Sequence, residues 1–349
     1  MKVAVIGRGF GERVVARVFA ETDGCEVVDV VSARNDRAVQ AAIEREDVDL
    51  VSVHSPPFLH APHVRRALAA GKAVLCDKPF ALDADEAADL EAEAEAAGVV
   101  ALCNFEFRYA PARGVLRDMI SDGELGRIEH VQMSRVSAGS RVPLRQWGWL
   151  FDRALGGGWV GAWGSHAIDG LRWMFRTEVA DVQALLRVDV EERPDGGGDL
   201  HACTAEDGFS ASLMLTNGVS VAIDSGFAAV ANTPARFIVF GSEAVAELVG
   251  EDRISVRRAG GTRDSIDLST DDDGDGHLAP MRRFAEVVRD AVTTGEVAAS
   301  TPTFVDGHAC DVVLDQLRAS PFATDATPDP ELPDSDLDPE SDPDSGPVV

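Results

Sequence analysis

A lysine stands where an apolar run ends, in the stretch Val74-Leu75-Cys76-Asp77-Lys78-Pro79. The chain contains only three lysines against 29 arginines, so arginine is its usual cation. Lysine differs from arginine because its ammonium group is a compact point charge whose pKa changes on burial, and such a group can sit close to a reacting oxygen atom. We therefore interpret Lys78 as a candidate catalytic residue; the alternative is a strand-end lysine that faces solvent.

Two glycines in the stretch VIGRGFGERV, Gly7 and Gly9, match the first two glycines of the pattern G-x-G-x-x-G. The third glycine position holds Glu12, and Gly11 comes one residue early. The pattern lies between an apolar run and a helical pattern, where glycines let backbone amides approach a pyrophosphate at a helix N-terminus. This context predicts dinucleotide binding, and a plain strand-to-helix turn is the alternative.

The end of the second apolar run indicates which dinucleotide is bound. Sites for NAD usually hold an acidic residue about 20 residues beyond the glycines, where it binds the ribose hydroxyls. This chain has Ser32-Ala33-Arg34 there, and a hydroxyl with a guanidinium suits a 2′-phosphate. NADP is therefore favoured over NAD, with the alternative that Arg34 is solvated and Asp36 binds the ribose.

Three histidines, His54, His60 and His63, lie within ten residues in the stretch HSPPFLHAPHV. Their spacing fits no common zinc pattern, so we expect no metal site. We expect His60 and His63 at the start of a helix, and the paired prolines should shape a loop beside the cofactor crevice.

These residues need a scaffold, and roughly the first 110 residues supply apolar runs that alternate with helical patterns. Alternation of this kind predicts βαβ units, which form a parallel sheet with helices on both faces. The apolar runs are KVAVIG, CEVVDVVS, DLVSVHS, AVLCDKP and VVALCNF.

After Gly126 the pattern becomes that of an antiparallel sheet, with candidate strands in RIEHVQMSRVSA, ADVQALLRVDVEE, FSASLMLTNGVSVAID, ARFIVFG and RISVRR. Asn217-Gly218 between two alternating runs is a hairpin signal. Two helical patterns follow, and the Pro-, Asp- and Ser-rich sequence from Pro321 is typical of a disordered tail. We therefore expect an α/β protein. It should have a Rossmann domain in residues 1–119, an α/β domain on an open, mostly antiparallel sheet in residues 120–320, and an acidic disordered tail in residues 321–349.

The charge of the chain excludes several classes of partner. Its net charge is −28, and the nine acidic residues from Asp325 to Asp344 leave −19 for the remainder. Such a surface repels nucleic acids and anionic membranes. Few lysines and many carboxylates suggest adaptation to high salt, with an ordinary acidic enzyme as the alternative. Five scattered cysteines indicate free thiols in a reducing cytoplasm, and no signal peptide or transmembrane run is recognisable.

Several of these stretches occur together, in order, in one family. They are VIGRGFG, SPPFLHAPHVRRALAAGKAVLCDKPFAL, NFEFRYAPA, GGGWVGAWGSHAIDGLRWMF and PTFVDGHACDVVLDQLRAS. Through them the chain, from residue 1 to about 320, resembles the glucose–fructose oxidoreductase / inositol dehydrogenase / MocA (Gfo/Idh/MocA) family. The resemblance implies an oxidoreductase that uses NADP, or NAD, on a hydroxyl or carbonyl of a sugar, inositol or related polyol. It also implies a homo-oligomer, a dimer or tetramer formed through the second sheet.

The resemblance implies roles for particular residues. In this family the lysine lies beside the nicotinamide ring and hydrogen-bonds the reacting oxygen, and the peptide before the proline, here Lys78–Pro79, is commonly cis. The implied cofactor-binding residues are Gly7, Arg8, Gly9, Phe10, Gly11, Ser32, Arg34, Ser55, Pro56, His60, Asp77 and Lys78.

A second catalytic element of the family usually reads Asp-x-Gly-x-His, with the histidine as general acid/base and the aspartate orienting it. His166 matches the histidine, but Ala162 occupies the aspartate position. Asp169 lies three residues after His166 on the same helix face and could replace the missing carboxylate. The family has an aspartate at this position in any case, so a structural role for Asp169 is the alternative. The alternative is a structural role for His166.

All five tryptophans lie within 27 residues around His166, and aromatic rings suit the C–H faces of a sugar. Their alternative places are the core and a subunit interface. The candidate substrate residues are Asn104, Arg108, Tyr109, Trp147, Trp163 and Asp169. Two other functions stay open: a non-catalytic or regulatory protein that binds NADP or a sugar, which Ala162 favours, and a lyase or hydrolase that cycles a tightly bound NAD.

Overall fold

The computed structural model describes residues 1–269 and 275–320, and it begins with a parallel sheet of five strands in the order β2-β1-β3-β4-β5. Its strands are β1 Lys2–Ile6, β2 Glu26–Val31, β3 Leu50–Val53, β4 Ala73–Cys76 and β5 Ala101–Cys103. Every residue of β3 and β4 is buried, as expected for a parallel sheet covered on both faces. The predicted Rossmann-type sheet is therefore confirmed.

Helices connect these strands where the sequence supplies caps. The connecting elements are η1 Gly11–Ala16, a π-helical turn that continues into α1 Arg17–Glu21, then α2 Asp36–Ile43, η2 Pro57–Leu59, α3 His60–Ala69 and α4 Ala84–Ala97. The side chain of Asn35 accepts a hydrogen bond from the amide of Ala38 and starts α2. Asp83 caps α4 in the same way through the amide of Glu86, and α4 ends at Gly98 with φ +64°.

A second sheet has eight strands in the order β15-β14-β13-β12-β6-β11-β10-β7. Its strands are β6 Ile128–Val136, β7 Val179–Arg187, β10 Gly208–Leu215, β11 Ser220–Gly226, β12 Arg236–Gly241, β13 Ala244–Val249, β14 Arg253–Arg258 and β15 Arg263–Asp267. All neighbours pair antiparallel except β6 and β11, which run parallel. The mostly antiparallel sheet is confirmed, and Gly218 turns the predicted hairpin with φ +87°.

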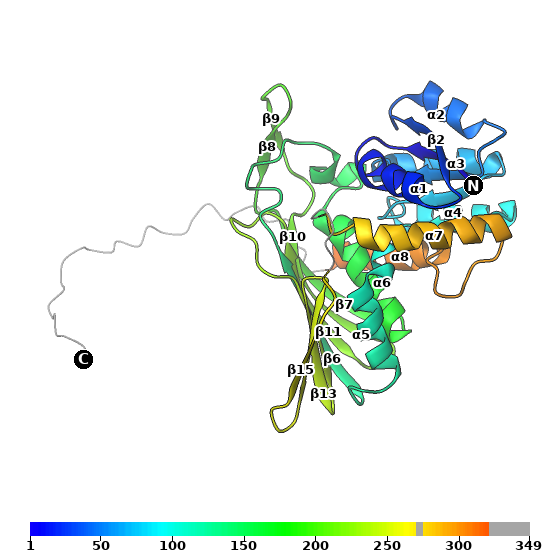
Figure 1. Cartoon of the computed structure of the whole chain (residues 1–349). Coiled ribbons are helices and arrows are strands. Elements are labelled where there is room, and N and C mark those ends of the chain that lie inside the picture. The colour runs from blue at the N-terminus through cyan, green and yellow to red at the C-terminus, as the bar shows by residue number, and fades with distance from the viewer. Residues whose placement is uncertain (270–274, 321–349) are drawn as a thin grey trace, which may run out of the picture.

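Helices α5 Pro111–Ser121 and α6 Ser165–Phe175 lie on one side of this sheet (Figure 1). The short elements near it are η3 Glu106–Tyr109, η4 Trp149–Phe151, η5 Arg153–Leu155, the π-helical turn η6 Val160–Gly164, and a small ribbon of β8 Glu192–Pro194 with β9 Leu200–Ala202. Strands β13 and β15 were not among the predicted ones.

The last two helices, α7 Leu278–Thr294 and α8 Phe304–Ala319, return to the first sheet (Figure 1). Met281, Phe284 and Val288 of α7 are buried in one cluster with Val3 and Val5 of β1. These positions recur at helical spacing and form one apolar stripe. Helix α7, which the sequence placed in the second domain, therefore completes the core of the first, and α8 packs in the core that the two sheets share.

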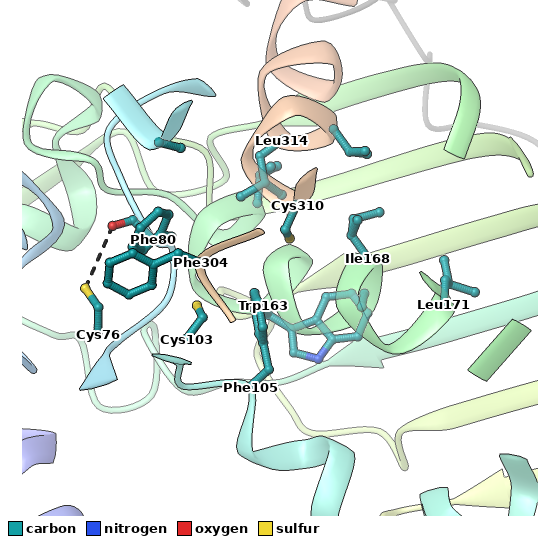
Figure 2. Packing of buried hydrophobic residues seen from close by; sticks show 14 of the residues in the cluster. Cys76, Phe80, Cys103, Phe105, Trp163, Ile168, Leu171, Phe304, Cys310 and Leu314 are labelled. Carbon is teal, nitrogen blue, oxygen red and sulfur yellow. Dashed lines mark hydrogen bonds between the residues drawn. The ribbon is translucent and has the colours of Figure 1, made fainter. Parts of the chain in front are cut away.

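The core between the two sheets is continuous, and Figure 2 shows its centre. Phe80 of the first domain packs against Phe304 of α8, with ring centroids 4.4 Å apart. All five cysteines carry free thiols, and Cys103 and Cys310 lie in this apolar core. In the described ranges no helix has the length and apolarity needed to cross a membrane. The predicted tail, residues 321–349, lies outside the described residues.

Candidate functional site

A groove of about 430 Å³ opens at the carboxyl ends of the strands of the first sheet. Because β1 lies between β2 and β3, the groove extends from the end of β2 to the end of β4. Ten of the predicted cofactor-binding residues line it: Gly7, Arg8, Gly9, Phe10, Ser32, Arg34, Ser55, Pro56, Asp77 and Lys78. Ligands of open α/β sheets bind at this edge.

The glycines shape one wall of this groove. Gly7 has φ +125°, and a Cβ atom there would lie 2.3 Å from the backbone oxygen of His54. A Cβ at Gly11 would lie 2.9 Å from the His54 Cβ, whereas Gly9 has open space around it. Gly11 therefore makes the close approach for which the fingerprint needs its third glycine, and Glu12 is exposed. The backbone at Gly9 borders open space, so its amides can approach the phosphates of a dinucleotide.

The end of β2 carries no acidic side chain into the groove. Ser32, Ala33 and Arg34 line it, whereas Asp36 begins α2 and pairs with Arg66 Nη1 at 2.5 Å. The alternative in which Asp36 binds the ribose is therefore disfavoured by its position. Three cations line the groove, Arg8, Arg34 and Lys78, against one carboxylate. In a chain of net charge −28, this balance marks an anion site.

That one carboxylate, Asp77, holds the residues around it. Its Oδ1 accepts hydrogen bonds from the Lys78 amide at 3.0 Å and from Asn104 Nδ2 at 3.3 Å. Its Oδ2 lies 3.1 Å from His54 Nδ1. Burial would raise the pKa of Asp77, but the hydrogen bond with His54 and the charge of Lys78 hold it at about 2. Asp77 therefore fixes the backbone at Lys78 by accepting its amide hydrogen. Asn104, which donates to the same carboxylate, is fully buried.

Lys78 reaches across to the second domain. The Lys78–Pro79 peptide is cis, as predicted, and Lys78 Nζ donates a hydrogen bond of 2.7 Å to the backbone oxygen of Ala162 in η6. Ala162 also lines the groove, together with Trp149 and His277. The ammonium group of Lys78 therefore sits where the end of the groove meets the second domain.

His166 lies outside the groove. It is only 3% exposed, and its ring packs against Phe107 with centroids 4.4 Å apart. Neither ring nitrogen has a hydrogen-bond partner in the described part of the chain. Burial, and then the charges of Lys78 and neighbouring cations, hold the pKa of His166 well below its usual value.

The carboxylate proposed to orient His166 is engaged elsewhere. Asp169 forms a buried ion pair with Arg108, whose Nε lies 3.0 Å from Asp169 Oδ2. Arg108 also pairs with Asp306 at 2.8 Å. Asp169 and Arg108 therefore neutralise each other in the core. This geometry favours a structural role for Asp169 over that of a partner for His166, and it does not direct Arg108 to the groove.

The carboxylate nearest to His166 is Glu106, which the sequence did not single out. Glu106 Oε1 lies 3.9 Å from His166 Nε2 and 2.7 Å from His277 Nδ1. Glu106 is fully buried, whereas the side chain of His277 is about one-third exposed. The two residues are 171 positions apart, so no local spacing could have revealed the pair.

Three other predicted residues lie away from the groove. Trp163 is buried in the core beside Phe105 (Figure 2), and Trp147 stacks on His201 at 4.6 Å. Tyr109 stacks on Phe284 of α7 at 4.9 Å. Trp163 and Tyr109 therefore pack with the core, and Trp147 lies partly exposed against His201. Trp149, another tryptophan of the cluster, lines the groove.

His60 starts α3 as predicted but is buried beneath the groove loop. Its Nε2 lies 2.7 Å from the Ser55 backbone oxygen, and its Nδ1 lies 3.2 Å from that of Phe80. Both nitrogens therefore contact the backbone rather than the groove. His63 contacts Ser55 Oγ at 3.3 Å, and the described residues contain no group of side chains that could hold a metal ion.

Two family models match the chain. The oxidoreductase family with an NAD-binding Rossmann fold (GFO_IDH_MocA) matches residues 1–105, and the GFO/IDH/MocA C-terminal domain matches residues 115–247. The two matches therefore cover the first sheet and the second sheet from β6 into β13.

Individual relatives match part of the chain at about 30% identity. An uncharacterized oxidoreductase of Synechocystis sp. is 32% identical over 241 residues, 64% of this chain and 65% of the relative. A dTDP-3,4-didehydro-2,6-dideoxy-alpha-D-glucose 3-reductase of Streptomyces violaceoruber is 32% identical over 61% of this chain and 58% of the relative. Levoglucosan dehydrogenase of Pseudarthrobacter phenanthrenivorans is 29% identical over 46% and 42%. The alignments thus span less than two thirds of each relative.

Solved structures share the fold over a longer part of the chain. Levoglucosan dehydrogenase in complex with NADH and levoglucosan matches with a TM-score of 0.79 and 21% identity, over 91% of this chain and 96% of that chain. Gal80p of Saccharomyces cerevisiae, as a super-repressor mutant, matches with a TM-score of 0.76 and 14% identity.

Proposed function

This chain belongs to the Gfo/Idh/MocA family of oxidoreductases, and from that premise we propose that it is an NADP-dependent dehydrogenase acting on a hydroxyl or carbonyl group of a sugar, inositol or related polyol. The observation that carries the proposal is a single groove that runs from Ser32 and Arg34 after β2, past the glycine turn after β1, to Lys78 after β4. NAD remains the alternative cofactor.

The groove residues fit the parts of a dinucleotide. The open backbone at Gly9, with the guanidinium of Arg8, would bind the pyrophosphate, and Ser32 with Arg34 would bind the 2′-phosphate of NADP. A 2′-phosphate carries negative charge, which the guanidinium complements and which an acidic residue in that place would repel. The bound nicotinamide would supply the hydride acceptor or donor.

Lys78 would hold and polarise the reacting oxygen. Its ammonium group donates to the Ala162 carbonyl, and an ammonium group has two further hydrogens for a substrate oxygen. Asp77 fixes the backbone from which this side chain extends, because it accepts from the Lys78 amide. A positively charged donor at the oxygen stabilises the negative charge that develops there during hydride transfer.

A sugar or polyol is supported by the neighbouring ring and by the named relatives. Trp149 lies at the end of the groove with Lys78, and an aromatic ring suits the C–H face of a sugar. The relatives are named for reactions on levoglucosan and on a dTDP-linked sugar. The activity of the whole protein is a proposal, since the alignments cover only part of each relative.

The test is a panel of sugars and polyols assayed at the nicotinamide absorbance with NADP and with NAD, in low salt and in molar salt. We expect net reduction of NADP by at least one substrate, and loss of turnover in Lys78→Met. Lys2→Met is the matched control, because Lys2 pairs with Asp47 at the surface. Product without net reduction would favour redox cycling, and binding without turnover across the panel would favour a non-catalytic role.

We also propose that the chain forms a homo-oligomer, a dimer or tetramer, through the second sheet. Ile238 and Phe240 alternate along β12 with the buried Phe237 and Val239, so they lie on the opposite face and are only half-buried. Among the described helices, α5 and α6 lie on the other side of the sheet (Figure 1). Their cross-strand neighbours on this face include the polar residues Gln132, His130 and Glu247. Two half-buried apolar side chains on a face that these helices leave uncovered suit contact with a second copy.

A further inference from the structure

A histidine and a buried carboxylate meet in the wall of the groove that Lys78 also lines. His277 lines the groove, and its Nδ1 lies 2.7 Å from Oε1 of Glu106. Glu106 is fully buried in η3, and its Oε2 has no hydrogen-bond partner in the described part of the chain. Such a carboxylate, removed from water and directed at one ring, is costly to bury unless the ring balances it.

The ring of His277 is held in place by aromatic neighbours. It packs edge-on against Phe10 at 5.2 Å and stacks on Phe107 at 5.1 Å, with 21° between the ring planes. Phe10 belongs to the glycine turn, so the histidine is fixed relative to the cofactor wall of the groove. Its second nitrogen, Nε2, has no partner among the residues that the structure describes.

We propose that His277 is the acid–base residue of this site, with Glu106 as its positioning residue, and that His166 does not exchange the proton. This inference rests on the proposed dehydrogenase function. A carboxylate that accepts from Nδ1–H fixes the tautomer in which Nε2 has the free electron pair. The same carboxylate stabilises the imidazolium once Nε2 has taken a proton.

The step balances with the groups already described. In the oxidation direction the substrate C–H bond would break, and its hydrogen would leave with the electron pair as a hydride that a bound nicotinamide would accept. The O–H bond also breaks; its proton goes to Nε2 of His277 and its electron pair becomes the second bond of the carbonyl. Lys78 keeps its own protons and holds the oxygen throughout. Reduction runs the same transfers in reverse, so the substrate is oxidised as the cofactor is reduced.

His166 is poorly placed for this proton. It does not line the groove, and the ring of Phe107 packs against both His166 and His277. Its nearest carboxylate oxygen, on Glu106, is 3.9 Å away and already takes the shorter contact with His277. Ala162 supplies no carboxylate to His166, whereas Glu106 supplies one to His277.

Several charged and titratable groups surround the pair of Glu106 and His277. They are His166, Lys78, Arg113 with its partner Glu251, Arg135, and Asp275 with its partner Arg13.

The first experiment compares histidine variants on the best substrate of the panel. His277→Asn and His277→Gln should lower kcat by about 10²–10⁴, the usual effect of losing a positioned acid–base group, with NADP affinity within about threefold of wild type. His166→Asn should keep most of the activity. His308→Asn is the matched control, because His308 forms a similar 2.7 Å contact with Glu91 far from the groove.

The role of Glu106 is tested by the pH–rate profile. Glu106→Gln should move the acidic limb of the profile to lower pH, because the carboxylate that stabilises the protonated ring is gone. Glu91→Gln, the corresponding change at the surface pair, should leave the profile where it is. A purely structural Glu106 would lower stability without moving the limb, and that result would overturn its assignment.

A measurement on the cofactor-free protein is independent of turnover. Nitrogen-15 NMR of the neutral His277 ring, assigned by its loss in His277→Asn, should show the hydrogen on Nδ1, and Glu106→Leu should abolish that preference. A hydrogen on Nε2 in the wild type would overturn the inference. So would full activity of His277→Asn together with loss in His166→Asn, and that outcome would leave the dehydrogenase function standing. A wild type that turns over nothing in the panel would instead overturn the proposed function, and the catalytic role with it.

Discussion

Replacement of Asp169 by asparagine separates a structural role from a catalytic one. The sequence suggested that Asp169 orients His166, whereas the structure pairs it with Arg108 through contacts of 3.2 and 3.0 Å from Nε and 2.5 Å from Nη2. Both side chains are at most 5% exposed. The charge of Asp169 keeps the pKa of Arg108 above its usual value in spite of burial. Asp169→Asn keeps the shape of the side chain and removes that charge.

The size of the effect follows from what Arg108 retains. Breaking a buried ion pair from one side costs about 3–5 kcal/mol, because the remaining charge is left without its partner. Arg108 keeps Asp306 at 2.8 Å and the Ser300 carbonyl at 3.2 Å, so we expect the lower end, about 3 kcal/mol. A change in which both charges leave, Arg108→Met with Asp169→Leu, should cost less than the single variant.

The assay is urea unfolding, followed by NADP titration and a pH–rate profile of the folded variant. Asp47→Asn serves as the control, because Asp47 pairs with Lys2 and Arg45 at the surface and exposed pairs contribute little. We expect a lower unfolding midpoint with unchanged NADP affinity and an unchanged profile. Wild-type stability together with a shifted pH–rate profile would refute this reasoning and restore Asp169 as the partner of His166.

Three further predictions follow from other parts of the structure. Arg34→Asp should weaken NADP binding by about 1.5–3 kcal/mol, the size of a hydrogen bond to a charged group, and spare NAD; equal affinity of the wild type for both cofactors contradicts it. Burial lowers the pKa of His63 to about 4 from its usual 6.5, so the unfolded chain takes up a proton that the folded chain refuses, and stability falls as pH drops through this window. His63→Gln should therefore flatten the dependence of unfolding free energy on pH between these values by up to about 1.4 kcal/mol per pH unit, and an unchanged slope in denaturant titrations would argue against it. Ile238→Asp should lower the oligomer mass in light scattering while NADP binding persists; an unchanged mass would exclude the β12 face as the contact.

Local pattern was enough to predict the first sheet and most of the groove. Gly7 has a positive φ that other residues rarely adopt, and Lys78 follows a buried strand within a few residues. In such places the neighbours in sequence are also the neighbours in space. The same reason explains why the hairpin at Gly218 was predicted correctly.

Contacts between distant segments were beyond the sequence. Glu106 and His277 meet only because α7 begins beside η3, and neither residue has a distinctive spacing. Asp169 has the helical spacing to reach His166, but it pairs with Arg108. A buried carboxylate needs an opposite charge, which a guanidinium supplies and a neutral ring does not. Trp163 belongs to a conspicuous aromatic cluster, yet its place is decided by the space between two sheets.

The position of α7 also bears on how the protein is made. Residues 281–291 of α7 pack on the face of the first sheet that carries Val3 and Val5. They leave the ribosome long after the five strands of that sheet. Thr303 adds a bridge to Leu102 at the edge of the same sheet only after that. A nascent chain of about 120 residues therefore holds every strand of its nucleotide-binding unit, but it lacks α7 over the part of this face that η1 and α1 leave uncovered. This unit cannot mature first during synthesis, as N-terminal domains generally do, and it must wait for nearly the whole polypeptide.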